Sequence, residues 1–296
     1  MSVSSSSSMS EEQKQQYRRV VEDAVAKACD LTLQQVALDE DGLQRLISHC
    51  DELDAAVARA IIIEARALST SDKLDHEEVE SNFGYFSHYE PKAIAMQTNR
   101  LRELIPGVDA ADEKVAERPL PDGAEGFFAI PRWEAIAPTY GEALEKMLAL
   151  IDRTRNGRFC NYRGGKLGAQ YLREYEPDAA MWKQIGEAQK GYGILVVPAQ
   201  FGLRHRGRSV RRAREVMRAN EFGLGAFTIA AMLLTHPERM KEYDDLWIDC
   251  AGDEYAPDGN DQFTETPFFF FNNGELEFDV IGYERDRFGS ASGFLL

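Results

Sequence analysis

The chain has 296 residues, of which 44% are apolar and 28% are charged, and its formal net charge is −16. These proportions are ordinary for a globular protein that can bury a large core. The acidic balance argues against a general attraction to nucleic acid or to an anionic membrane, because repulsion opposes the encounter, so any anion-binding site must be local.

The sequence predicts a cytoplasmic protein without a membrane partner. Its four cysteines lie far apart and form no CxxC pair, which is typical of a reducing compartment. The most apolar segment, residues 222–234, is shorter than the about 20 residues that a bilayer-spanning helix needs. Residues 1–10 lack the basic start and the apolar stretch of a secretory leader, so we expect a flexible tail, with Met9 as an alternative first residue.

Helical patterns dominate residues 11–106. Apolar residues recur every three or four positions from Tyr17 to Ala28 and again within residues 42–68, which predicts two amphipathic helices. A third helix is expected over residues 90–105, before a Pro-Gly pair that ends it. None of these segments has the basic face of a DNA-recognition helix, so we expect a helical packing region.

The rest of the chain combines strand and helix patterns. Residues 107–126 are rich in charge, proline and glycine, and we expect them to form a linker. In the domain that follows, residues 127–296, strand-like and helix-like segments alternate, which predicts an α/β or α+β fold with helices covering a mixed sheet. The expected strands span residues 126–131, 193–199 and 245–252, and the expected helices span residues 134–153, 177–190 and 225–240.

A β-hairpin is predicted close to the C-terminus. Two strand-like runs flank Asn273-Gly274, a pair that adopts positive φ at little cost. After this turn, Leu276, Phe278 and Val280 alternate with acidic residues, which predicts one buried face and one solvated face.

An arginine-rich segment carries the main functional prediction. Residues 204–218 hold seven arginines and no lysine, and they follow a strand and a glycine-containing loop and enter a helix with Ser209 as its N-cap. Backbone N–H groups at such a junction favour an anion, and guanidinium groups bind phosphate or carboxylate oxygens in pairs. We therefore expect binding of a phosphate-bearing small molecule or nucleotide, although neither a P-loop nor a dinucleotide fingerprint is present. The predicted ligand-binding residues are Arg204, Arg206, Arg208, Ser209, Arg211 and Arg212.

A metal-assisted enzyme is the first alternative. If the strands 193–199 and 245–251 run parallel, their C-terminal ends meet at one sheet edge and bring Asp249, Asp253 and Glu254 close to the arginines. Such carboxylates could hold Mg²⁺ against a phosphate, with His205 as the candidate catalytic proton carrier in phosphoryl or phosphodiester transfer.

The second alternative is a non-enzymatic interaction protein. Its arginine face would dock an acidic protein surface, or would form a structural lattice of ion pairs with the 50 acidic residues of the chain. Nonspecific binding of nucleic acid is less favoured than either. A further histidine, His236, follows the apolar helix, and we expect it to close the helix C-terminus as a cation.

Overall fold

The computed structural model describes residues 10–35, 39–48, 53, 57–58, 61, 72–87, 89–282 and 286–296. Two compact units make up the chain, Met1–Leu68 and Ser69–Leu296. In the first unit, α1 (Glu11–Gln35) and α2 (Glu40–Ser48) confirm the first predicted helix and the start of the second. Residues 1–9, where the flexible tail is predicted, and most of residues 49–71 lie outside the described residues.

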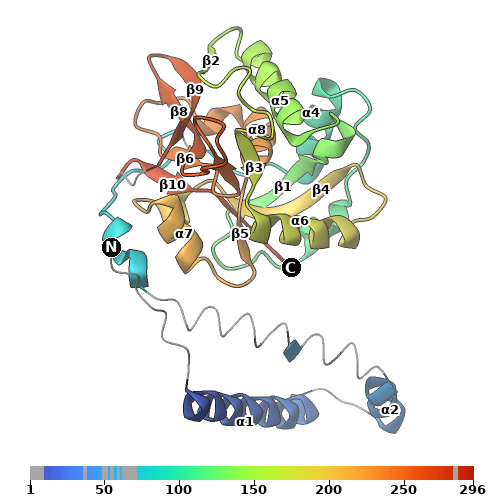
Figure 1. Cartoon of the computed structure of the whole chain (residues 1–296). Helices are drawn as coiled ribbons and strands as arrows, with labels where there is room; N and C mark the ends of the chain where they lie inside the picture. The colour runs from blue at the N-terminus through green and yellow to red at the C-terminus, as the bar shows by residue number, and fades with distance from the viewer. Residues whose placement is uncertain are drawn as a thin grey trace. The chain divides into compact units, whose positions relative to one another are not determined.

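Two sheets form the framework of the second unit (Figure 1). The four-stranded sheet has the order β1-β4-β11-β5, and all of its neighbouring strands are antiparallel. The five-stranded sheet has the order β10-β6-β8-β9-β2, and it is mixed, because its two edge strands pair in parallel. A separate antiparallel pair joins β3 to β7.

The strand bounds show that distant segments of the chain share each sheet. The four-stranded sheet contains β1 (Gly126–Pro131), β4 (Ile194–Gln200), β5 (Glu221–Gly223) and β11 (Ser292–Phe294). The five-stranded sheet contains β2 (Phe159–Asn161), β6 (Trp247–Asp249), β8 (Thr266–Asn272), β9 (Glu275–Ile281) and β10 (Phe288–Ser290). The small pair consists of β3 (Leu172–Glu174) and β7 (Asp253–Tyr255).

The helices cover these sheets, and α8 lies at the centre of the core. The longer helices of this unit are α4 (Ile94–Leu104), α5 (Tyr140–Thr154), α6 (Glu176–Ala188), α7 (Val210–Val216) and α8 (Ala226–Thr235). Every residue of α8 is buried, and the helix packs against α4, α5 and β1. Among the described residues, no helix has both the length and the apolarity to cross a membrane.

These elements confirm the predicted fold class, in its α+β form. The mixed sheet, the covering helices and the C-terminal hairpin are all present. Strands β8 and β9 meet at the predicted turn, where φ is 49° at Asn273 and 86° at Gly274. The predicted buried face of β9 is correct, but Glu277 on the opposite face is buried as well, with 3% exposure.

Residues 107–126 differ from the predicted linker. Val108, Ala111 and Val115 are buried in the core, and Ala111 forms a bridge with Ile194 of β4. The helix α4, predicted as part of the region 11–106, packs on β1 and α8 and so belongs to the second unit. Because these three apolar residues lie among charged residues and glycines, the composition of the segment does not indicate that they pack in the core.

The metal-assisted alternative requires the strands 193–199 and 245–251 to run parallel in one sheet, and this condition is not met. Strand β4 pairs with β1 and β11, whereas β6 pairs with β8 and β10 in the other sheet. Hydrophobic patterns identify strands but carry no information on their partners, which here lie far away in sequence.

His236 closes α8 as predicted, but not as a cation. Its Nε2 accepts a hydrogen bond from the backbone N–H of Lys92 at 3.0 Å, which requires a neutral ring. Burial, together with the charge of Lys92, lowers the pKa of His236 to about 4. The ring also packs edge-on against Tyr89 and Phe128.

Candidate functional site

The arginines at the start of α7 are paired with two glutamates from the segment before β1. Arg208 donates to Glu78 at 2.7 Å, and Arg212 donates to the same carboxylate at 3.3 Å. Arg211 forms an ion pair with Glu77. The hydrogen bonds from Arg208 and Arg212 hold the pKa of Glu78 below its usual value, in spite of partial burial. These guanidinium groups therefore stabilise the packing of residues 72–78 against α7.

The inner part of the arginine segment surrounds another glutamate, Glu221 of β5. His205 contacts Glu221 at 2.7 Å, Arg204 donates to it at 3.1 Å, and the Ser292 hydroxyl donates to it at 2.6 Å. Burial by itself raises the pKa of Glu221, but these partners lower it by a larger amount, and the resulting pKa is about 2. The His205 ring is only 1% exposed, so the candidate proton carrier is enclosed by protein groups.

Two residues of the predicted anion site have other partners. Arg206 is exposed and donates to the carbonyl of Phe83 at 3.0 Å. Ser209 is the N-cap of α7 as predicted, since its Oγ accepts from the backbone N–H of Arg212 at 3.0 Å. Its hydroxyl also donates to Glu77 at 2.5 Å. Anion binding by this segment stays a prediction, and an ion-pair lattice already occupies most of its guanidinium groups.

The predicted metal ligands are divided between two places. Asp253 and Glu254 are neighbours on β7, so their side chains point to opposite faces of the strand. Asp253 lines one cavity, whereas Asp249 and Glu254 line another that they share with Ser209 and Arg211. The described residues contain no cluster of three or more histidine, cysteine, aspartate or glutamate side chains that could hold a metal ion.

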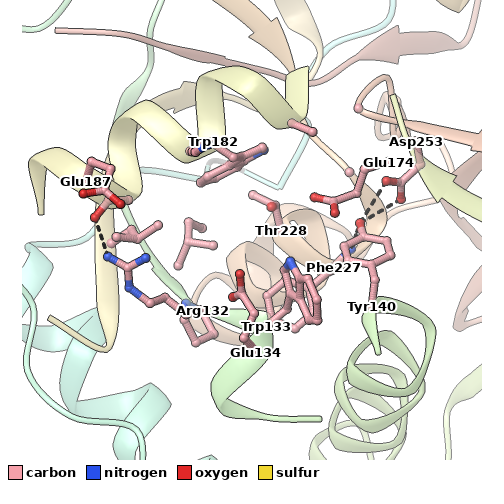
Figure 2. Close-up of a pocket in the computed structure, with 18 residues that line it drawn as sticks. Arg132, Trp133, Glu134, Tyr140, Glu174, Trp182, Glu187, Phe227, Thr228 and Asp253 are labelled. Atoms are coloured by element: carbon pink, nitrogen blue, oxygen red, sulfur yellow. Dashed lines mark hydrogen bonds between the residues drawn. The ribbon is translucent and has the colours of Figure 1, made fainter. Parts of the chain in front are cut away.

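The cavity that Asp253 lines has a volume of about 310 Å³ and aromatic walls (Figure 2). Trp182 of α6 stands on one side, and Trp133, Tyr140 and Phe227 stand on the other. Trp133 and Tyr140 pack edge to face, with ring centroids 6.0 Å apart. These aromatic rings come from four separate elements and together line the cavity.

Two carboxylates form the inner end of this cavity. Glu174 of β3 and Asp253 of β7 are directly opposite in the antiparallel register, and both side chains line the cavity. Both oxygens of Asp253 accept from the Tyr140 hydroxyl, at 2.9 and 3.0 Å, and one also accepts from the N–H of Ala226 at 2.7 Å. Asp253 thus binds the first turn of α8, and Gly225 allows the close approach.

Burial changes the protonation of this pair. It raises the pKa of Asp253 to about 7, opposed by the hydrogen bonds from Ala226 and Tyr140 and assisted by the charge of Glu174. It also raises the pKa of Glu174, with a contribution from the nearby charge of Glu134. Within the described part of the chain, the Glu174 carboxylate has neither a hydrogen-bond partner nor an ion-pair partner.

The charged side chains at the cavity rim differ in whether they already have a hydrogen-bond partner. Arg132 donates to the carbonyls of Gly186 and Gln189, at 2.7 and 3.2 Å, so its guanidinium caps the end of α6. Glu134 is exposed at the rim, as are Lys183 and Glu187 of α6. The carboxylates that line the cavity therefore outnumber the cations, and one of the cations is already engaged by backbone carbonyls.

Sequence reasoning identified Asp253 but missed the site to which it belongs. Nothing in the spacing of Trp133, Glu174, Trp182 and Asp253 relates them, because tertiary packing alone brings them together. The one usable signal is the short segment around Gly225, where glycines precede an apolar helix that needs a polar partner at its N-terminus.

Comparisons with known proteins provide no further assignment. No protein-family model, no curated protein and no solved structure matches the chain.

Proposed function

We propose that the second unit binds a small organic cation, an ammonium or guanidinium group attached to an apolar body, in the aromatic cavity beside α6. The observation that supports this most directly is the Glu174 carboxylate, half-buried and unpaired among the described residues, at the end of a cavity walled by Trp133 and Trp182. A carboxylate in such surroundings is costly unless a positive charge accompanies it.

The aromatic walls favour the same kind of ligand. A cation over the face of a tryptophan or tyrosine ring gains about 0.5–2 kcal/mol, and the gain increases as water is excluded. Trp133, Trp182, Tyr140 and Phe227 provide such rings, and Tyr140 lies beside the Asp253 carboxylate. A neutral molecule of the same shape would bring no positive charge to Glu174, so the pocket discriminates by charge.

The test is a calorimetric and thermal-shift titration of the whole protein. The probes are tetramethylammonium, butylammonium and butylguanidinium, with butanol as the neutral control. We expect saturable binding of a cation and none of butanol, and at least a tenfold loss of affinity in Glu174→Gln. The matched control is Glu176→Gln, an exposed residue on α6 that does not line the cavity. The proposal fails if no cation binds, or if Glu174→Gln binds as tightly as the wild type.

Binding of a phosphate-bearing small molecule or nucleotide near the arginine segment is the second candidate. Ser209, Arg211 and Arg214 line a second cavity of about 740 Å³, and 70% of the Arg211 side chain is exposed there. A phosphate would compete with Glu77 for Arg211, and a guanidinium group suits either oxyanion.

A nucleotide panel separates the two candidates. Phosphate and nucleoside mono-, di- and triphosphates, each with and without Mg²⁺, are titrated into wild type, Arg211→Ala and the control Arg100→Ala, which removes an exposed arginine of α4. A saturable thermal shift that disappears only in Arg211→Ala supports the second candidate. The absence of any shift leaves the arginines with a structural or partner-docking role.

A further inference from the structure

We infer that the aromatic cavity exchanges a proton for its ligand: the Glu174–Asp253 pair holds one proton while the cavity is empty and releases it when an organic cation binds. This inference rests on the proposed function and adds the way in which pH regulates the site. No covalent bond to the ligand forms or breaks, since one positive charge enters the cavity and one proton leaves for solvent.

The register of β3 and β7 is the first observation that supports it. Glu174 and Asp253 are paired directly across the two strands, which places their Cβ atoms about 4.5–5.5 Å apart on the same face. Figure 2 shows both carboxylates at the same end of the cavity, beside Tyr140. Two carboxylates that line one cavity from directly opposite strand positions repel each other when both are ionised, so without a compensating cation they titrate as a coupled pair.

The groups that donate to the pair do not provide that cation. Tyr140 of α5 and the Ala226 N–H of α8 are neutral donors, and both bind Asp253. Arg214 of α7 approaches from outside, but its guanidinium donates to the backbone carbonyls of Ala251 and Asp253 rather than to either carboxylate. It lowers the pKa of Asp253 less than burial raises it.

The remaining charges around the cavity increase the need for a cation. Glu134 adds a negative charge on the side of Trp133, and its field raises the pKa of Glu174 beyond the effect of burial. On α6, Lys183 and Glu187 are both exposed at the rim, four residues apart, and their charges offset each other. The pair therefore takes its compensating charge from solvent as a proton, or from a ligand as an organic cation.

The direction of the pH effect follows from this exchange. Burial raises the pKa of Asp253 to about 7 and also raises the pKa of Glu174, so the empty pair retains a proton up to neutral pH. A bound cation lowers both values and displaces the proton. Ligand affinity must then increase with pH, by at most about tenfold per unit while one proton is released, and level off above the pKa of the empty pair.

Calorimetry of tetramethylammonium binding tests the exchange, because this probe has no proton of its own to lose. Titrations of the full chain at pH 6.5 in phosphate and in ACES, which carry no net positive charge and whose ionisation enthalpies differ, give the number of protons released. We expect a release approaching one in wild type and in Glu176→Gln, and an affinity that increases between pH 5.5 and pH 8.

An independent measurement covers the case in which Glu174→Gln binds too weakly for calorimetry. The infrared band of protonated carboxyl groups should decrease when tetramethylammonium is added to wild type, and should not change in Glu174→Gln. Binding without proton release, with a pH-independent affinity, overturns this inference and leaves the proposed function intact. Failure of every cation to bind overturns both.

Discussion

Asp249 shows how a single buried carboxyl group can control stability. Its side chain is 3% exposed, its Oδ1 has no hydrogen-bond partner among the described residues, and burial raises its pKa to about 8. The folded protein keeps this group protonated at pH values where the unfolded chain has released the proton. Asp249 therefore destabilises the fold progressively as pH rises from about 4 to about 8.

The substitution Asp249→Asn should remove this pH dependence. Between pH 4 and pH 8, the variant should gain about 1.4 kcal/mol of unfolding free energy over the wild type for each unit by which pH rises. Urea unfolding at pH 5, 6 and 7 measures it. A difference that stays constant across the three pH values would show that Asp249 ionises as freely in the folded state as in the unfolded chain.

At the scale of elements, the first turn of α8 depends on a close contact that only glycine permits. A Cβ atom at Gly225 would lie 2.5 Å from Oδ1 of Asp253 and 2.5 Å from the Tyr140 hydroxyl. Gly225 and Asp253 are buried and Tyr140 is partly buried, so the contact is relieved only if the Asp253–Tyr140 pair moves. This contact joins α5, β7 and α8 at the inner end of the aromatic cavity.

The substitution Gly225→Ala should therefore displace the Asp253–Tyr140 pair, lower the melting temperature by several degrees and weaken cation binding. Overpacking of this kind costs about 1–3 kcal/mol. The control is Gly84→Ala, because a Cβ at Gly84 would meet no atom within 4 Å. Differential scanning calorimetry and the tetramethylammonium titration measure the two effects. Equal melting temperatures for both variants would contradict the role assigned to this contact.

For the molecule as a whole, several buried ionisable groups change the stability of the fold with pH in opposite directions. Burial raises the pKa of Asp178 and Asp253 to about 7 and that of Asp249 to about 8, so each of these groups reduces stability as pH rises from about 4. His236 acts in the opposite sense between its unfolded value of 6.5 and about 4, because the folded protein keeps it neutral. Glu221 is stabilising at neutral pH, and its contribution is lost as pH falls from 4.5 towards 2.

The sum of these effects predicts a stability maximum in mildly acidic solution. The three aspartates act against one histidine, and Glu174, whose pKa burial also raises, acts in the same direction as the aspartates. The free energy of unfolding should therefore be greater at pH 5.5 than at pH 8, and should decrease again below pH 4. Urea unfolding in dilute solution across this range measures it. Greater stability at pH 8 than at pH 5.5 would contradict the protonation states assigned to the three aspartates.

Local patterns in the sequence were sufficient for most of the elements. The helix at 177–190, the strand at 193–199 and the hairpin at Asn273-Gly274 follow from side-chain periodicity and from turn chemistry, and these forces act between near neighbours. The N-cap role of Ser209 is equally local. Sequence also identified the arginine segment as a place of concentrated charge, although not what that charge contacts.

Tertiary structure alone decided the strand partners and the candidate site. Most of the arginines in the segment pair with one of three glutamates, Glu77, Glu78 and Glu221. The first two precede the arginine segment by more than 120 residues and the third follows α7 after a turn, so no periodicity in the sequence relates them to α7. In the same way, Glu174 and Asp253 face each other only because β3 pairs with β7. The sequence by itself determined the longer helices, the longer strands and the hairpin turn, since those depend on short-range preferences, but it did not reveal three-residue strands such as β3 and β7. Pairing across long stretches of chain determined which carboxylates are neutralised by arginines and which remain in an aromatic cavity without a partner.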